Sequence, residues 1–570
     1  MPVRAGDESG FTMIMTVIGI TLIALLAAVA VTAVNGSAQI TGRDLARKQA
    51  YEAALAGINE YAFHLHANSA YWTECTKAVP SGEVSALNQQ GSTTNRRPVP
   101  GGSGATYALE LIPATGHSEC VPGIEAASAS MLETGQMKGT FRVRATGFSG
   151  KAQVPVTATF KPASFLDYVY FTQLETSDPV TYGNAELIAA AQRQCTKTIK
   201  EGRYTIPLEN EAGQFLNSSG KVTSYESSAE FCDVISFVGA DNIKGPMHTN
   251  DAFVFCESPT LGRNSNDAVE VSYPEEPGWF QTKKLPREDS RGCSGSNSNV
   301  KGHWQVNSPA LIPPETNREL ATIAESTYRF EGETSICLEG ATLRVGAGKS
   351  CTSAALPFPA NGVIYVGNKN NECNAAYTPF NVSYATTGVD TCGNVNIIEG
   401  KYAKPLTIAA ANNVLIEHSI EKTTEEGMLG LIATNFIRIY HPVELVHPQE
   451  CHWEQKWNGE WEWVKVCTEN TSITECKGNL TGTMENLKIE AALLALQHSF
   501  IVDNYRCGSR IGTLSVKGAI AQKYRGAVGT TGNSGYVKNY EYDERLKTTE
   551  PPSFIEPIKS DWVIGRETVE

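Results

Sequence analysis

The chain begins with a short charged leader that ends at Ser9-Gly10 and is followed at once by a long apolar stretch. Phe11 to Val34 contains no charged residue, and as a helix it would be about 36 Å long, enough to span a bilayer with some tilt. A secretory signal peptide has a shorter apolar core of roughly 7–15 residues before its cleavage site. The triplet Gly36-Ser37-Ala38 offers such a site, so a cleaved signal peptide stays an alternative, as does an ordinary uncleaved anchor.

The pattern after Val34 becomes amphipathic without a break. No proline occurs from Phe11 to His66, and small or apolar residues recur at steps of three and four, namely Ala46, Ala50, Ala53, Ala54, Gly57, Ile58, Tyr61 and Leu65. Charged residues take the other side. The sequence therefore predicts one helix over residues 11–66, with half of it in lipid and half packed on a domain.

The order Ser9-Gly10-Phe11-Thr12 followed by such a helix resembles the type IV pilin and pseudopilin family. The resemblance implies that a prepilin peptidase removes leader residues 1–10 by cutting between Gly10 and Phe11, and that the new amino terminus is methylated. It also implies a cytoplasmic leader, an extracytoplasmic remainder, and a helix that bundles with those of other pilin or pseudopilin subunits.

The chain departs from the family pattern at two places. The family usually has Glu at the fifth mature position, where Met15 stands here, and this argues against a bulk repeating subunit and for a minor or tip subunit. The charges around the apolar stretch also differ from the positive-inside pattern, because the leader has Arg4 against Asp7 and Glu8 while Arg43, Arg47 and Lys48 follow the helix.

Residues 67–163 are expected to form a small β-sheet module. Three segments, 107–114, 139–150 and 151–160, alternate apolar and polar residues, and Gly147 to Gly150 marks a turn. Packed on the lower half of the helix, they would complete a pilin-like α+β module. Cys75 and Cys120 could join its loop.

Residues 164–570 are far more than a pilin module needs. Short apolar runs recur between Asn, Asp and Gly turns, so this region is expected to be a large extracytoplasmic β-rich domain. Segments such as ANNVLIEHSI suit rungs of a parallel β-helix, while a sandwich or an irregular stack of sheets stays open. Residues 313–330 indicate a helix, and residues 487–500 fit either a helix or a buried strand.

Fourteen cysteines all follow the apolar segment, which favours disulfides in an oxidising compartment over free buried thiols. Connectivity cannot be read from sequence, although Cys195 with Cys232 and Cys337 with Cys351 are near neighbours. The candidates are Cys75, Cys120, Cys195, Cys232, Cys256, Cys293, Cys337, Cys351, Cys373, Cys392, Cys451, Cys467, Cys476 and Cys507.

The segment from Cys451 to Cys467 predicts a β-hairpin. Asn458-Gly459 is a strong turn signal, and a three-residue turn would place Cys451 opposite Cys467. Four tryptophans then lie on the face of the cysteines, namely Trp453, Trp457, Trp461 and Trp463. The favoured interpretation is that they pack on the domain; the alternative is a projecting aromatic patch that contacts a partner, a surface or a glycan.

The net charge of -14 makes nucleic acid and anionic lipid poor partners. Nucleotide-binding and hydrolase motifs are absent, and Asp241, His248 and Asp251 are the most enzyme-like group, more simply read as turn residues. The group His441, His447 and His452 near Glu444 and Glu450 has no ligand spacing. We therefore expect no enzyme, no catalytic residue, no cofactor and no metal.

Together these features predict a non-enzymatic minor or tip subunit of a type IV pilus or pseudopilus, anchored in the membrane before assembly and exposed at the cell surface afterwards. Its external domain would serve assembly initiation or adhesion, with a surface or glycan as the ligand. The alternative is a membrane-anchored β-helix protein that binds or cleaves surface polysaccharide.

Overall fold

The computed structural model describes residues 9–75, 96–101, 104–133, 139–202, 207–228, 232–281, 299–348, 350–373, 377–384, 390–457, 460–471, 474–480, 482, 484–530, 533–558 and 562–569. The chain is mainly β with a long N-terminal helix. It divides into two compact units, the first made of Met1–Pro162 with Asp561–Glu570 and the second of Ala163–Ser560. The expected leader, residues 1–10, lies almost wholly outside the described residues.

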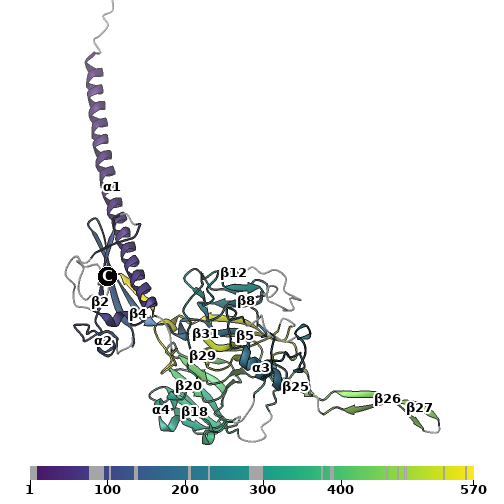
Figure 1. Ribbon diagram of the computed structural model, residues 1–570. Coiled ribbons are helices and arrows are strands. Elements are labelled where there is room, and N and C mark those ends of the chain that lie inside the picture. Colours follow the sequence, from purple (N-terminus) through teal and green to yellow (C-terminus); the bar gives the residue numbers. More distant parts are fainter. Residues whose placement is uncertain are drawn as a thin grey trace, which may run out of the picture. The chain divides into compact units, whose positions relative to one another are not determined.

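Helix α1 is one continuous element, Ser9–Ala67, as the sequence predicts (Figure 1). Its 59 residues make it about 88 Å long. The segment Met13–Ala30 has a mean hydropathy of 2.6 and none of it is buried, so it is long and apolar enough to cross a membrane. The lower half carries the predicted buried face, on which Ala50, Ala54 and Ile58 are fully buried.

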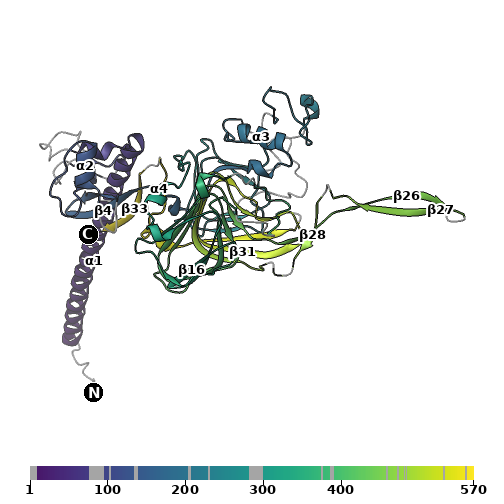
Figure 2. The same cartoon turned by 90° about the horizontal axis from the view of Figure 1, so that it is seen from below.

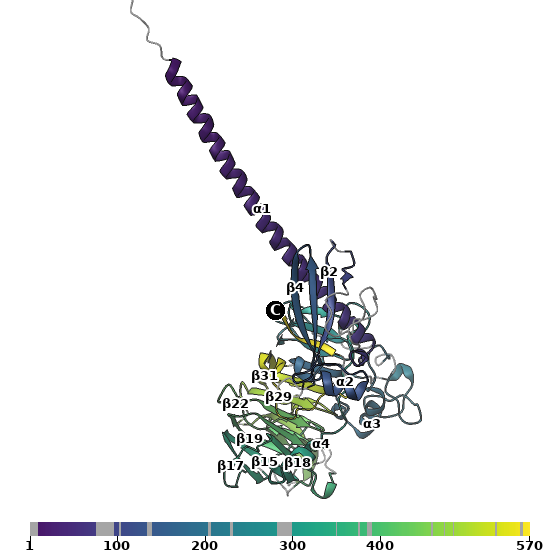
Figure 3. The same cartoon turned by 90° about the vertical axis from the view of Figure 1, so that its left-hand side faces the viewer.

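The lower half of α1 packs on an antiparallel sheet in the order β1-β2-β3-β4-β33 (Figure 3). The elements of this first unit after α1 are η1 Tyr71–Glu74, β1 Arg97–Pro98, β2 Thr106–Ile112, α2 Ile124–Met131, β3 Phe141–Ser149, β4 Ala152–Pro162 and β33 Trp562–Val569. Gly147 on β3 allows the closest approach, because a Cβ there would overlap the backbone of Ala50 and crowd that of Ala54.

The last strand of the sheet comes from the other end of the chain. β33 pairs antiparallel with β4, and Trp562 lies opposite Pro162. The Trp562 ring is 4.8 Å from that of Phe141, and its Nε1 donates a hydrogen bond of 2.7 Å to the carbonyl of Ser69. The predicted boundary, which ran the large domain to residue 570, is therefore corrected: the second unit is an insertion between two neighbouring strands of the first.

The second unit is organised around a column of parallel strands, each hydrogen-bonded to the next (Figure 3). The column runs through β14 Arg329–Glu331, β18 Val363–Gly367, β20 Leu406–Ala410, β23 Leu429–Ala433, β29 Lys488–Ala495, β31 Arg510–Arg525, β5 Tyr170–Ser177, β7 Met247–Thr249, β10 Ala268–Val271 and β13 His303–Gln305.

Two further sets of parallel pairings flank this column. One runs through β15 Thr334–Gly340, β19 Val395–Tyr402, β22 Ile420–Lys422, then β29, β31, β32 Gly535–Tyr542, β6 Asn242–Lys244, β9 Thr260–Leu261 and β12 Asn299–Val300. The other runs from β19 through β21 Val414–Ile416 and β24 Ile437–Ile439 to β30 Phe500–Val502. The expected β-helix stays a prediction for the unit as a whole.

The remaining elements of the second unit, apart from the hairpin region described below, are short. They are η2 Phe165–Asp167, η3 Pro179–Thr181, α3 Ala185–Gln194, η4 Tyr225–Ser227, β8 Phe253–Phe255, β11 Trp279–Gln281, α4 Glu319–Ile323, η6 Ser326–Tyr328, β16 Thr342–Ala347, β17 Leu356–Pro357, η7 Lys369–Asn371 and η8 Glu544–Lys547. The helix expected over 313–330 is thus only α4 with one 3₁₀ turn, and the ambiguous segment 487–500 contains strand β29 instead of a helix.

Side chains that stack from one strand to the next stabilise the pairing of successive parallel strands. One file of the column, continuous in register, is made of Ile364, Ile408, Leu431, Leu493, Ile520, Tyr170, Met247 and Val269, all buried. At a neighbouring turn, Asn435 donates to Asn412 and Asn412 donates to Asn394, at 2.6 and 2.8 Å. Each layer of strands therefore buries its apolar side chains against the next layer and hydrogen-bonds its turn asparagines to it.

The chain joins this stack in its middle. β5, the first strand after the first unit, pairs with β31, one of the last. From β5 the chain builds outward to β13, then starts again at β14 on the opposite end and returns strand by strand to β31. Ser164 near the start of the unit donates a hydrogen bond of 3.0 Å to Glu556 near its end. The insertion therefore begins and ends at neighbouring points.

Replacing Trp562 with Ala should loosen the first unit, because β33 loses the ring that packs on Phe141. We expect a loss of roughly 2 kcal/mol, below the cost for a fully buried Trp because this ring is half-buried. Faster amide hydrogen exchange in β3 and β4 would report it.

Ile558→Ala is the control, because Ile558 is 69% exposed in the second unit. Exchange in β3 and β4 should not change in this variant. If Trp562→Ala also left that exchange unchanged, the return of the C-terminal strand to the first sheet would be wrong.

Candidate functional site

A two-stranded hairpin projects from the second unit (Figures 1 and 2). It consists of β26 Gln449–Trp457 and β27 Trp461–Glu469, and in the part of the chain that the structure describes these two strands pair only with each other. Cys451 lies opposite Cys467 and forms a disulfide with it, and Trp457 lies opposite Trp461, as the sequence pattern predicts. The predicted turn residues Asn458 and Gly459 lie outside the described residues.

The four tryptophans of the hairpin are exposed to solvent. Trp453, Trp457, Trp461 and Trp463 have 62–65% of their surface accessible. The favoured interpretation from sequence, in which these side chains pack on the domain, is therefore wrong. Strand pairing fixes which face they share, but within the described residues no other element covers that face.

The two faces of the hairpin differ in chemistry. Because side chains alternate along a strand, one face carries the four tryptophans and the Cys451–Cys467 disulfide, together with Gln455 and Lys465 and, at the base, Gln449 and Glu469; this is the tryptophan face. The rear face carries Glu450, His452, Glu454, Lys456, Glu462, Val464, Val466 and Thr468. Over residues 449–469, five glutamates against two lysines leave the hairpin acidic.

The hairpin is an insertion that leaves the stack beneath it intact. Its stem is the antiparallel pair β25 Val443–Val446 and β28 Glu475–Asn479. β23 and β24 precede it and pair directly with β29 and β30, which follow it. The parallel columns thus continue across the insertion, and the stem leaves from a formed edge.

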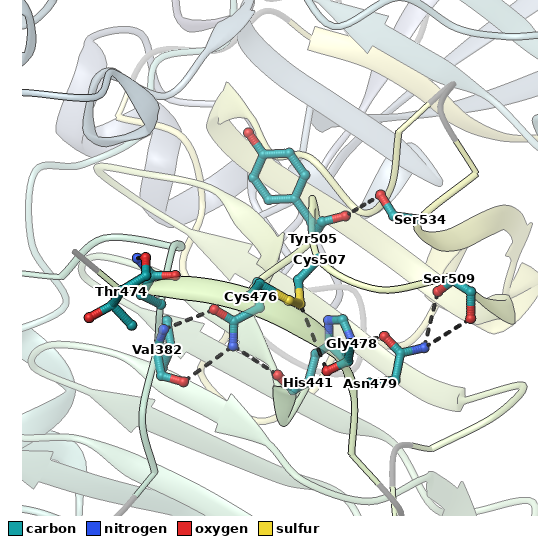
Figure 4. Close-up of a disulfide and its surroundings, with 12 residues drawn as sticks. Val382, His441, Thr474, Cys476, Gly478, Asn479, Tyr505, Cys507, Ser509 and Ser534 are labelled. Carbon is teal, nitrogen blue, oxygen red and sulfur yellow. Dashed lines mark hydrogen bonds between the residues drawn. A yellow bond between two sulfur atoms is a disulfide. The ribbon is translucent and has the colours of Figure 1, made fainter. Parts of the chain in front are cut away.

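A disulfide and several hydrogen bonds fasten the stem to the turn at residues 503–509 (Figure 4). Cys476 of β28 is bonded to Cys507. The Nδ2 of Asn479 donates to the carbonyl of Ser509 at 3.1 Å, and the Nδ1 of His441 lies 3.0 Å from the carbonyl oxygen of Asp503. The segment before β25 and the end of β28 are therefore both fastened to the same turn.

A buried ion pair lies directly beneath these bonds. Arg438 donates to both carboxylate oxygens of Asp503, at 3.1 and 2.7 Å, and the hydroxyls of Tyr377 and Tyr384 donate to the same carboxylate. Burial alone would lower the pKa of Arg438, but the Asp503 charge overcomes this and raises it. Burial raises the pKa of both tyrosines, so they stay donors. Asp503 thus accepts four hydrogen bonds at the base of the hairpin, from Arg438 and the two tyrosines.

The three residues that the sequence offers as the most enzyme-like group, Asp241, His248 and Asp251, are buried, and each forms its own hydrogen bonds. Asp241 accepts from Lys538 Nζ at 2.8 Å, and Asp251 accepts from the backbone N–H groups of Glu175 and Ile199. The imidazole of His248 lies between Glu270 and Asn250, at 3.0 and 3.1 Å. All three have at most 2% of their surface exposed. Each of the three is therefore engaged by its own set of neighbouring groups.

Every candidate cysteine that lies within the described residues is disulfide-bonded. Disulfides join Cys75–Cys120, Cys195–Cys232, Cys337–Cys351, Cys373–Cys392, Cys451–Cys467 and Cys476–Cys507. Cys256 is also disulfide-bonded, and Cys293 lies outside the described residues. Among the described residues, no group of three or more His, Cys, Asp or Glu side chains could hold a metal ion.

Comparison with known proteins gives little further information. No protein-family model matches the sequence, and no curated protein matches it. Among solved structures, the chain is similar to the competence-associated pilin ComZ from Thermus thermophilus, at 12% identity and a TM-score of 0.25, over 92% of this chain and 97% of that one. A TM-score this low does not show a common fold.

The exposure of the tryptophan face can be tested by fluorescence quenching. Acrylamide should quench the emission of the four hairpin tryptophans strongly, because the other four, Trp72, Trp279, Trp304 and Trp562, are buried or half-buried. Changing all four hairpin tryptophans to Ala should remove the readily quenched fraction and leave the melting temperature unchanged. Weak quenching of the original chain would show that the face is covered.

Asp503→Asn should free the stem of the hairpin, because it leaves the Arg438 charge buried without a partner. Removing one member of a buried pair costs about 3–5 kcal/mol. We expect faster hydrogen exchange in β25 and β28. The control is Glu444→Gln, which breaks the exposed pair with Lys477 and should change exchange little. Equal effects of the two changes would contradict the role given to Asp503.

Proposed function

We propose that this chain is a non-enzymatic, pilin-like minor or tip subunit of a type IV pilus or pseudopilus. Helix α1 holds it in the membrane until assembly, and its second unit, a β-helix in this proposal, is presented outside for assembly initiation or adhesion. The observation that carries the proposal is the division of α1 into an uncovered apolar half and a half packed on an antiparallel sheet.

The apolar half of α1 supports an anchoring and bundling role. Large side chains along Met13–Ala30 are mostly exposed, for example Ile20 at 67% and Leu25 at 66%. Apolar surface of this extent is unstable in water, so lipid or other apolar helices must cover it. A pilin-like helix would be covered by lipid while it is in the bilayer and by neighbouring helices once it is in a filament.

Two features support a minor or tip position. Met15 offers no carboxylate to a neighbouring subunit's amino terminus, and a buried amine without a counter-charge is costly. The second unit, residues 163–560, is also much larger than the module that carries it. A subunit that pairs weakly with neighbours and bears a large insertion suits a place with few neighbours.

The disulfides support an external location for both units. Every described cysteine is bonded, in each of the two units. Such bonds form and persist in oxidising compartments and are rare in a reducing cytosol.

The proposal predicts the amino terminus of the mature protein. Intact-mass and peptide mass spectrometry should find N-methylated Phe11 at the start of the chain. Gly10→Ala should block this cleavage while the protein still inserts into the membrane, and Ser9→Ala should be processed normally. Retention of the leader in the unmodified chain, or a start near Gln39, would remove the pilin assignment.

The tryptophan face favours one part of a second candidate function. A membrane-anchored protein that binds surface polysaccharide would need an exposed aromatic surface but no processing at Gly10. An uncleaved anchor together with sugar binding would support this second candidate over the first.

A further inference from the structure

We propose that the tryptophan face binds a single chain of a neutral polysaccharide, with sugar rings stacked on the indole rings. This deepens the adhesion role proposed above and depends on it only for placing the hairpin outside the cell. Four observations carry it: the spacing of the rings, the polar residues between them, the size of the face and the charge of the hairpin.

The four rings form a narrow track along the hairpin. Trp457 and Trp461 face each other at the tip, with ring centroids 5.5 Å apart. Trp463 lies two residues nearer the base on β27, and Trp453 lies two residues further on β26. At about 3.4 Å per residue, the rows are about 7 Å apart and the track is about 14 Å long. This is the shape of a site for a linear ligand.

The chemistry of the track matches a pyranose ring. An indole presents a face of partial negative charge, and one side of a pyranose is a flat patch of C–H groups of partial positive charge, with hydroxyls at the rim. Gln455 lies opposite Trp463 and Lys465 lies opposite Trp453 on the same face, and both are exposed. Their amide and ammonium groups are placed to hydrogen-bond rim hydroxyls while the rings stack.

The size of the face argues against a globular protein or a second copy as the occupant. Two nine-residue strands side by side give a face of about 300 Å², whereas a stable protein interface buries about 800 Å² on each partner. An extended peptide would need unpaired backbone groups, and these lie at the strand edges, not on the tryptophan face. A thin polymer that lies along the rings needs neither.

Charge argues against the other polymers and surfaces that bind aromatic rings. Nucleic acid requires basic residues, but the hairpin has five glutamates and two lysines. Anionic lipid is disfavoured for the same reason. Zwitterionic bilayers attract tryptophan, but Glu460 and Glu462 at the tip would have to enter the interface, and the face has no aliphatic side chain to reach hydrocarbon.

The hairpin is already ordered before a ligand arrives. The Cys451–Cys467 bond crosses its two strands, and the Cys476–Cys507 bond holds its stem. Binding therefore orders few groups, which keeps the entropic cost low. Two-stranded ribbons also twist strongly, so successive rings turn about the hairpin axis. A twisted track fits one flexible polysaccharide chain better than a flat crystalline surface.

The test uses the full-length protein in neutral detergent micelles, titrated with cellohexaose, chitohexaose and maltohexaose by calorimetry and tryptophan fluorescence. At least one sugar should bind saturably and change the emission. Trp453→Ala and Trp463→Ala should each weaken binding about tenfold, which corresponds to about 1.4 kcal/mol for each lost stacking contact. Replacing all four tryptophans with Ala should abolish binding, while the rear-face control Glu450→Gln with Glu454→Gln should keep it.

Failure to bind any of the three sugars, or binding that survives the four alanines, would overturn the proposal. So would tryptophan-dependent binding to phosphatidylcholine vesicles or single-stranded DNA without sugar binding, or tryptophan-dependent self-association in sedimentation. The two proposals fail separately: the four-alanine variant should still begin at methylated Phe11. Intact sugar binding by a protein without that terminus would refute only the pilin assignment.

Discussion

The close contact between α1 and strand β3 is the constraint on which the rest of the molecule depends. Ala50 and Ala54 of the helix meet Gly147 of the strand, where no side chain could be accommodated. This contact, with the aromatic cluster around Tyr61, Phe141 and Phe160, fixes which part of α1 the protein covers. The segment Met13–Ala30 lies outside this contact, and none of it is buried. The anchoring and bundling proposed for α1 depend on where the contact with the sheet ends along the helix.

The second unit is compatible with that arrangement because of how the chain joins it. Since β5 pairs with β31, the insertion starts and finishes at adjacent points, and β33 can return to pair with β4. A large β stack is thereby carried between two strands of a small sheet without breaking it. The hairpin repeats the device on a smaller scale, because the columns on either side of β25–β28 stay paired. Each insertion adds a new surface while the strand pairing of the sheet or stack that carries it stays intact.

Local signals in the sequence predicted much of this structure, and long-range pairing was the part they missed. The absence of proline predicted α1, the alternating segments predicted β2 to β4, and the cysteine spacing predicted the register of the hairpin. Nothing in WVIGRETV indicates that its partner is a strand about 400 residues earlier. The hairpin pattern showed that the tryptophans share a face, but a pattern does not tell whether another element covers that face. Sequence alone likewise does not give the partners of Asp241 and His248, which the structure shows to be buried hydrogen-bonding groups.

The most direct test of the central claim is hydrogen exchange along α1 in the full chain reconstituted in lipid nanodiscs. One uninterrupted helix, apolar in its first half and packed on the sheet in its second, predicts slow exchange without a gap from Met13 to Leu65. Fast exchange over residues 34–42 would divide α1 into two separate pieces. That result would contradict the account, because the sheet and the apolar half of α1 would then no longer form a single rod.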